Sequence, residues 1–263
     1  MMRDKQIPAN QRRVQILQQV HSHGSVRLTE LMHMFNLSDT TIRRDLSLLE
    51  EQQRLKRVRG GAIALRPALA SAPFYDKARE HSEEKMRIGM AAANLISPGE
   101  SIILDSGTTP LQVAIALLQV FKGPMPLTVV TNSLPVVYEL QNCNLIRLNL
   151  LGGILLPEFQ ATVGPQTVSD LQQLRVDKAF IGCDGLTLSH GLTTPDMLVA
   201  EVGRIMVEVA RQVIAVTDSS KLGRAGFTQI VPVERIHMLV TDTGAPPDLV
   251  EQIRSLGIQV ILV

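Results

Sequence analysis

Short aliphatic runs alternate with amphipathic stretches over residues 83–263. The runs are apolar throughout rather than at every second position, and Gly, Asp, Ser or Asn residues bound them. Seven of these runs are SIILD, PLTVVTN, IRLNLLGG, KAFIGCDG, QVIAVTD, HMLVTD and IQVILV. Apolar residues at helical spacing lie between them, as in EEKMRIGMAAANLI, SDLQQLR and MLVAEVGRIMVEVARQ. Because continuous apolar strands fit a sheet that is covered on both faces, the pattern predicts a Rossmann-like α/β domain with a mostly parallel sheet.

The first 66 residues follow another pattern. Apolar residues recur at helical spacing in 10–23, in 27–35 and in a third segment that Ser38 opens as a good N-cap. In this third helix Ile42, Leu46 and Leu49 share one face. The stretch RLKRVRGGAIAL then predicts a basic two-stranded hairpin that turns at Gly-Gly. Three helices followed by such a hairpin predict a small winged helix-turn-helix domain.

Polar side chains occupy the outward side of the third helix. An outward-facing first turn is where a recognition helix meets the major groove, and Arg side chains there bond guanine edges or phosphates. Asp45 is expected to orient a neighbouring Arg, because phosphates repel a free carboxylate. On the helix and the hairpin, the residues expected to bind DNA are Ser38, Thr40, Thr41, Arg43, Arg44, Lys56, Arg57 and Arg59.

Charge is divided unevenly between the two regions. Residues 1–66 contain 12 Lys and Arg against 6 Asp and Glu, whereas residues 67–263 contain 14 against 19. Positive charge that is concentrated in a small domain attracts the phosphates of nucleic acid. Charge alone fits a solvated surface equally well, so the prediction of a DNA partner depends on the helix and hairpin patterns.

Length and composition limit the remaining possibilities. The 263 residues suit a winged helix-turn-helix domain at 1–66, a linker and entry segment at 67–82 and a larger domain at 83–263. No apolar run approaches the roughly 20 residues that span a bilayer, and the first residues lack a hydrophobic signal region. We therefore expect a cytoplasmic protein without a membrane partner. Cys143 and Cys183 form no metal-binding motif, and we expect neither a metal nor a cofactor.

Small and polar residues gather where five of the expected strands end. Ligands of open parallel sheets bind at these carboxyl ends. Glycine lets the backbone approach an anion, Ser and Thr donate hydrogen bonds, and the helix that begins near Pro110 directs its N–H groups to the same place. One such cluster alone is usually a turn, but five on one sheet predict a site for a small anionic ligand. Its expected residues are Asp105, Ser106, Gly107, Thr108, Thr109, Asn132, Ser133, Gly152, Gly153, Asp184, Gly185 and, in the cluster Asp218-Ser219-Ser220-Lys221, Lys221.

Both regions resemble one bacterial family. SDTTIRRDL followed by LKRVRGGA, within residues 9–66, resembles the DNA-binding domain of the DeoR-type transcriptional regulators. LDSGTT, VVTNS, LGG, GCDGL and TDSSKLG, within residues 74–255, resemble successive motifs of the sensor domain of that family. That domain is similar in fold to ribose-5-phosphate isomerase, glucosamine-6-phosphate deaminase and the coenzyme A transferases.

The resemblance implies a ligand and a role. A phosphorylated sugar would bind the second domain, with its phosphate at Ser106, Gly107, Thr108 and Thr109 and with Lys221 near the phosphate or a sugar oxygen. Asp105, Asn132 and Asp184 would bind hydroxyls, and Glu201 would face the mouth of the pocket. The family implies a repressor of a carbohydrate-metabolism operon, and binding of the ligand is expected to relieve the repression. Because operators have two-fold symmetry, the resemblance also implies a homo-oligomer, a dimer or larger.

An isomerase that carries a DNA-binding domain is the alternative. Such an enzyme needs a general base, and its motif places an acidic residue directly after Gly-Ala-Asp. In this chain Gly-Cys-Asp is followed by Gly185, which has no side chain. Although Asp184 could substitute, we expect a sensor rather than an enzyme, and we assign no catalytic residue.

Overall fold

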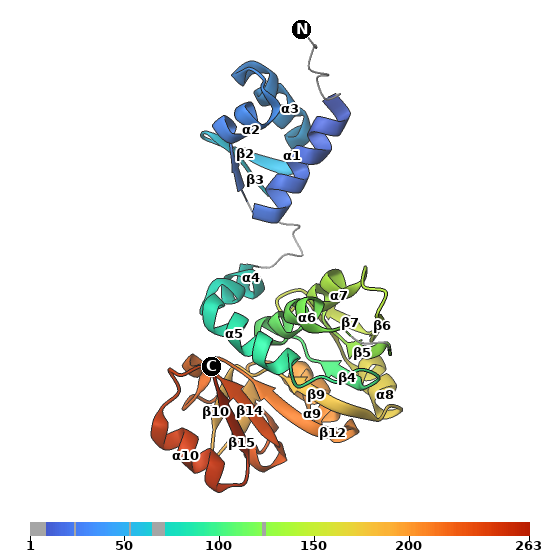
Figure 1. The fold of residues 1–263 in the computed structure, drawn as a ribbon, viewed down its shortest axis with the longest axis vertical. Coiled ribbons are helices and arrows are strands. Elements are labelled where there is room, and N and C mark those ends of the chain that lie inside the picture. The colour runs from blue at the N-terminus through green and yellow to red at the C-terminus, as the bar shows by residue number, and fades with distance from the viewer. Residues whose placement is uncertain (1–8, 24, 53, 65–71, 123–124) are drawn as a thin grey trace. The chain divides into compact units, whose positions relative to one another are not determined.

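The chain divides into two units, residues 1–68 and residues 69–263. The computed structural model describes residues 9–23, 25–52, 54–64, 72–122 and 125–263 (Figure 1). Among these, no helix is long and apolar enough to cross a bilayer.

The first unit is a winged helix-turn-helix, as predicted. Its elements are α1 (Ala9–His23), β1 (Ser25–Arg27), α2 (Leu28–Phe35), α3 (Asp39–Glu51), β2 (Leu55–Val58) and β3 (Gly61–Ala64). Ile42, Leu46 and Leu49 of α3 are buried in its core, which confirms the apolar face that their spacing predicts.

The wing differs from the prediction in two details. It turns at Arg59 and Gly60 rather than at Gly60-Gly61, and Gly60 takes the positive φ of 92° that this turn needs. Gly61 instead begins β3 and pairs with Arg27 of β1, a strand that the sequence pattern did not predict. A Cβ atom on Gly61 would lie 2.0 Å from the carbonyl oxygen of Val26, so the third strand can approach only because this residue is glycine.

The second unit is built on a seven-stranded parallel sheet. Its strands are β4 (Ser101–Leu104), β5 (Leu127–Thr131), β6 (Ile146–Leu150), β9 (Val176–Ile181), β12 (Ala210–Val216), β14 (Met238–Thr241) and β15 (Gln259–Leu262), in the order β15-β14-β12-β9-β4-β5-β6. Every neighbouring pair is parallel. Each of the seven predicted runs overlaps one of these strands, although β9 and β12 begin two residues before their runs, and the predicted fold class is confirmed.

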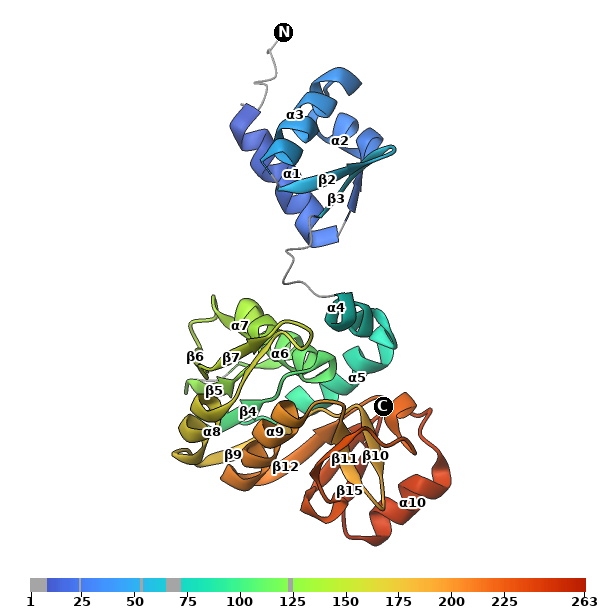
Figure 2. The ribbon, with the colours of Figure 1, turned by 180° about the vertical axis from the view of Figure 1, so that it is seen from behind.

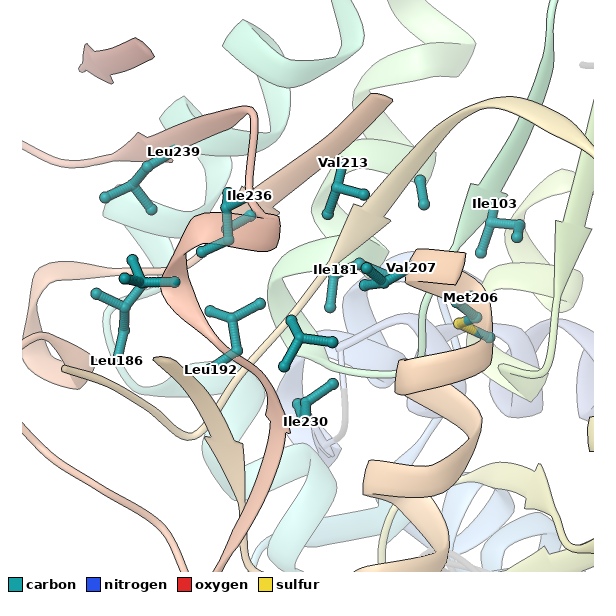
Figure 3. Close-up of a cluster of buried hydrophobic side chains, with 14 of the residues drawn as sticks. Ile103, Ile181, Leu186, Leu192, Met206, Val207, Val213, Ile230, Ile236 and Leu239 are labelled. Carbon is teal, nitrogen blue, oxygen red and sulfur yellow. The ribbon is translucent and has the colours of Figure 1, made fainter. Parts of the chain in front are cut away.

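Helices cover both faces of the sheet (Figures 1 and 2). They are α5 (Ser82–Ala93), α6 (Thr108–Val120) and α7 (Leu134–Leu140) on one face, and α8 (Pro165–Gln172), α9 (Met197–Val209) and α10 (Pro247–Ser255) on the other. Successive residues of one strand enter opposite cores: Ile102 and Leu104 pack with the first group of helices, and Ile103 packs with the second (Figure 3). This two-sided burial explains why a central strand such as β4 has a continuous apolar run.

Several elements were not predicted. The helix expected over MLVAEVGRIMVEVARQ ends at Val209, and the next residue already opens β12. Short antiparallel strands form two further small sheets: β7 (Ile154–Leu156) with β8 (Ala161–Val163), and β10 (Gly185–Thr187) with β11 (Gly191–Thr194) and β13 (Thr228–Val231). The expected linker at 67–82 contains a helix, α4 (Ala72–Arg79), which belongs to the second unit. Its Phe74 is buried, so tertiary packing rather than helical periodicity stabilises it.

Candidate functional site

Exposed basic and hydroxyl side chains define one surface of the first unit. Thr40, Arg43 and Arg44 are exposed on α3, and Lys56 and Arg59 are exposed on the wing. In the described part of the chain Arg44 forms no ion pair, so its guanidinium is available to a base edge or a phosphate.

The other expected DNA-binding residues have contacts within the unit. Arg57 is half-buried, and its guanidinium donates to the Ser47 hydroxyl oxygen at 2.5 Å. Ser38 stands at the N-cap of α3 as expected, but its hydroxyl lies 3.0 Å from that of Thr40 and 3.1 Å from that of Thr41 and does not cap the backbone. Arg57 therefore packs against α3, and the hydroxyl groups of Ser38 and Thr41 contact each other at the first turn of this helix.

Asp45 orients arginines, but not those of its own helix. It is 2% exposed, and its carboxylate accepts from Nε of Arg12 at 2.6 Å and from Nε of Arg13 at 2.9 Å. Arg43 instead pairs with the exposed Asp39, one turn earlier. Because an exposed ion pair is weak, Arg43 can exchange this partner for a phosphate.

A pocket opens in the second unit where the strand order reverses. The chain leaves β4 toward β5 and β6 on one side and returns to β9 and β12 on the other, and ligands of such sheets bind at this switch point. Residues that follow β4, β9 and β12 line the pocket together with α4 and α5. The lining residues are Phe74, Lys77, Lys85, Asp105, Ser106, Gly107, Thr108, Thr109, Pro110, Glu158, Phe159, Gly182, Cys183, Asp184, Thr194, Val199, Asp218, Lys221 and Ile230.

One end of the pocket is built for an anion. Gly107, with a φ of 137°, forms the N-cap of α6, and no side chain caps this end of the helix. Within the described residues, the backbone N–H groups of Gly107, Thr108 and Thr109 have no hydrogen-bond partner. Lys221 lines the same pocket and forms no ion pair with any described residue. Free N–H groups at the positive end of a helix, in a pocket that also holds an ammonium group, suit a phosphate.

Asp105 fixes the loop that carries these N–H groups. It is 5% exposed, and it accepts from the backbone N–H of Ser106 at 2.7 Å and of Gly182 at 3.1 Å. Burial raises the pKa of Asp105 to about 7, although the hydrogen bonds from Gly182 and Ser106 oppose the rise. Both oxygens are thus occupied by backbone donors, and the carboxyl group joins the end of β4 to the end of β9.

Asp184 connects the pocket to α4. One carboxylate oxygen accepts from Nζ of Lys77 at 2.6 Å, and the other accepts from the Thr194 hydroxyl at 3.1 Å. Because both side chains line the pocket, a ligand that bonds to Asp184 competes with an ion pair to α4.

Six of the expected ligand-binding residues do not line the pocket: Asn132, Ser133, Gly152, Gly153, Gly185 and Glu201. The β7–β8 hairpin covers the ends of β5 and β6, where Thr162 donates its backbone N–H to the Asn132 carbonyl at 2.9 Å. The Ser133 hydroxyl accepts from the backbone of α7, and the carbonyl of Gly152 accepts from Thr167 at 2.6 Å.

Gly153, Gly185 and Glu201 also lie outside the pocket lining. Gly153, with a φ of 144°, follows Gly152 beneath the hairpin, where its Cβ would lie 2.6 Å from the Val163 carbonyl oxygen. Gly185 begins β10, and Glu201 is exposed on α9.

The sequence reasoning missed most of the other lining residues. Lys85 lies on an amphipathic helix and Phe74 in a segment without periodicity, so neither carried a signal. Glu158 belongs to a hairpin that was not predicted. Asp218 belongs to a cluster that the sequence predicted as part of the site, but only Lys221 of this cluster was assigned a role. Burial raises the pKa of the Cys183 thiol to about 12, which agrees with packing rather than nucleophilic chemistry.

Comparison with known proteins places both units in one family. The family model described as the DeoR C terminal sensor domain matches residues 80–243, and the one described as the DeoR-like helix-turn-helix domain matches residues 12–68. The chain is 36% identical to the HTH-type transcriptional repressor GlcR of Bacillus subtilis over 88% of each protein. It is 32% identical to the glycerol-3-phosphate regulon repressor of Escherichia coli, over 96% of this chain and 98% of that protein.

Among solved structures, the chain is similar to ribose 5-phosphate isomerase A from Methanocaldococcus jannaschii. The TM-score is 0.40 and the identity 17%, over 54% of this chain and 55% of that one.

Proposed function

The chain belongs to the DeoR family of transcriptional regulators, and from that premise we propose that it binds operator DNA under the control of a phosphorylated sugar held in its second unit. The observation that carries this proposal is the group of unpartnered N–H groups at Gly107, Thr108 and Thr109, in a pocket that Lys221 also lines. A phosphate supplies the acceptors and the negative charge that this end of the pocket lacks. The hydroxyls of a sugar would extend from it toward Asp184 and Asp218.

The regulated genes are proposed from the names of the relatives. A repressor of the glycerol-3-phosphate regulon is among them, and several others are also named as repressors or regulators. We infer a repressor of a carbohydrate-metabolism operon, which the ligand releases from DNA.

The DNA contacts are assigned to the exposed surface of α3 and the wing. Arg43 and Arg44 reach the major groove, and Lys56 and Arg59 grip phosphates beside it. One winged helix reads a short sequence, so two copies of the chain would bind a two-fold operator as a dimer or a larger oligomer.

An isomerase is the second candidate, and the pKa of Asp105, about 7, is the observation that favours it. A general base must reach the proton that it takes from the substrate, whereas the hydrogen bonds from Ser106 and Gly182 hold the Asp105 carboxyl group against the backbone at the ends of β4 and β9. At Gly185, a Cβ atom would lie 2.4 Å from the Arg224 carbonyl oxygen. This position therefore has no room for a catalytic carboxylate, and we propose a sensor.

Thermal-shift screening of pentose and hexose phosphates tests the proposal, because a ligand that binds the folded state raises its melting temperature. Lys221→Met should abolish most of the shift, and Lys122→Met, at an exposed lysine outside the pocket, should keep it. The absence of any shift across the panel, or an equal shift in Lys221→Met, would overturn the assignment of the pocket.

A further inference from the structure

Lys85 of α5 is a buried cation that the proposed function leaves without a role. It is 2% exposed and lines the pocket. Its Nζ donates to the carbonyl oxygen of Lys77 and, at 2.6 Å, to that of Glu80. No carboxylate of the described chain lies within ion-pair distance of this ammonium. Carbonyl groups satisfy its hydrogen bonds but leave its charge without a counter-ion, which is costly for a buried group. Burial accordingly lowers the pKa of Lys85.

A half-buried lysine, Lys178, shows the usual arrangement. Lys178 also bonds to a backbone carbonyl, that of Leu95 at 2.6 Å, but its Nζ lies 2.7 Å from both carboxylate oxygens of Glu100 as well. Lys178 does not line the pocket. The two lysines differ in their counter-ions. A carboxylate neutralises the ammonium group of Lys178, whereas Lys85 has no carboxylate partner among the described residues and lines the pocket.

An acceptor without a partner lies in the same pocket. Asp218 is 1% exposed; one of its carboxylate oxygens accepts from Ser220, and the other, Oδ2, has no hydrogen-bond partner in the described residues. The charges of Asp218 and Lys85 influence each other, but the two groups are not paired. A ligand with an anionic group for Lys85 and a hydroxyl donor for Asp218 would satisfy both.

Lys85 also holds the end of α4. The two carbonyl groups that it binds belong to the last turn of this helix and to the residue that follows it. The ion pair between Lys77 and Asp184 is a second connection from α4 to the pocket. Along the chain, α4 is the first described element after the winged helix-turn-helix.

We propose that Lys85 binds the anionic group of the ligand and thereby couples occupancy of the pocket to the hydrogen bonding of α4. The anion supplies the missing counter-charge and draws the ammonium group away from the carbonyls of Lys77 and Glu80, so that the last turn of α4 loosens. The inference rests on the proposed function, because it needs an anion in this pocket, and it adds the residue that senses the anion.

Binding to the full-length chain tests the first half of the inference. The probes are ribose 5-phosphate, glucose 6-phosphate and inorganic phosphate, titrated calorimetrically below the melting temperatures of all variants. Lys85→Gln removes the charge and should weaken each interaction at least about ten-fold, as expected for a charge-assisted hydrogen bond in a buried site. Lys178→Gln, at a half-buried lysine outside the pocket, should keep the wild-type affinity.

Hydrogen exchange in α4 tests the second half and needs only the wild-type chain. Binding of a sugar phosphate should accelerate exchange in the peptide that spans residues 74–80. In Lys85→Gln this peptide should exchange fast with or without the probe. If the variant does not fold, the wild-type comparison still decides the question.

The outcomes separate the two proposals. A wild-type chain that binds neither these probes nor any pentose or hexose phosphate of the screened panel overturns the proposed function, and this inference with it. Binding that Lys85→Gln leaves unchanged, or wild-type exchange in α4 that a bound sugar phosphate leaves unchanged or slows, overturns only the inference.

Discussion

The two units present their functional groups in opposite ways. In the winged helix-turn-helix most of the DNA-binding candidates are exposed, and all lie between Ser38 and Arg59, on one helix and one hairpin. In the sensor unit the pocket is lined by residues from Phe74 to Ile230, many of them buried. A long polyanion requires an open cationic surface, whereas a small ligand is recognised by groups that converge from several elements.

Buried aspartates show the same contrast. Asp45 in the first unit is neutralised by Arg12 and Arg13. Asp105 in the second has only backbone donors, and its pKa rises to about 7. One carboxylate stabilises its unit as a charge, and the other stabilises its unit best as the neutral acid.

The largest effect is expected from Asp45→Ala. Removal of this carboxylate takes an acceptor from two arginines, one of them buried, and should cost the first unit about 3–5 kcal/mol. Hydrogen exchange should show the loss in the core amides of α1 and α3 and not in those of β9 and β12. Equal destabilisation of both units would contradict their energetic separation.

A pH titration of the sensor unit should show the next largest effect. Because the folded pKa of Asp105, about 7, lies above its ordinary value of 3.8, the folded unit keeps this proton to higher pH than the unfolded chain. The resulting stability, about 4 kcal/mol, is full below about pH 4 and is lost as the pH rises through about 7, with about 3 kcal/mol of the loss between pH 5 and pH 8. Denaturant unfolding at pH 5 and pH 8 measures it. Asp105→Asn should flatten the profile, and an unchanged profile in this variant would exclude Asp105 as its source.

Gly185→Ala sharpens the distinction between sensor and enzyme. Its Cβ would lie 2.4 Å from a backbone oxygen and 2.8 Å from the Thr193 hydroxyl oxygen. Overpacking of this kind should destabilise the second unit by about 1–3 kcal/mol, as measured by denaturant unfolding. Gly152→Ala, at a position where the Cβ meets nothing within 4 Å, is the control. A neutral Gly185→Ala would show that a side chain does fit there.

Arg44→Ala should affect DNA binding alone. Loss of a guanine contact should cost about 1–3 kcal/mol of binding free energy, whereas loss of a phosphate contact should reduce the salt slope by about one. Fluorescence anisotropy at several salt concentrations distinguishes the two. Arg87→Ala, an exposed arginine of the second unit, should bind DNA as the wild type does; wild-type binding by Arg44→Ala would remove α3 as the recognition helix.

Asp39→Ala should have the smallest effect on stability. The exposed ion pair with Arg43 contributes little to folding, so the melting temperature should stay unchanged. Affinity for DNA should rise slightly, because a carboxylate leaves the surface that meets phosphates. Weaker DNA binding would mean that Asp39 positions Arg43 for the DNA.

The sequence predicted the parts of the molecule that depend on local pattern. The seven parallel strands were recognisable from their short aliphatic runs, which are buried on both faces in the central strands, and α3 because Ile42, Leu46 and Leu49 share a face. The strands β1, β7 and β8 have three residues each, which is too short for a period, and α4 is held by its contacts with the pocket.

The same reasoning explains which site residues were predicted. The pocket includes Ser106 to Thr109, Asp184 and Lys221, which directly follow core strands. The hairpin that covers Asn132 and Gly152 follows from tertiary pairing that strand-end motifs do not encode. A role for Lys85 could not be predicted from the sequence, because its contacts with α4 and with the pocket exist only in the folded structure.

The affinity of the full-length chain for DNA, measured with and without a bound sugar phosphate, tests the central claim most directly. The DNA is a duplex that the protein selects from a random pool, and the ligand is the sugar phosphate with the largest thermal shift. A coupling free energy of about 1–3 kcal/mol would change the affinity by roughly 5- to 150-fold, and we predict weaker DNA binding in the presence of the ligand. An unchanged DNA affinity, together with isomerisation of the sugar phosphate by the purified chain, would contradict the account.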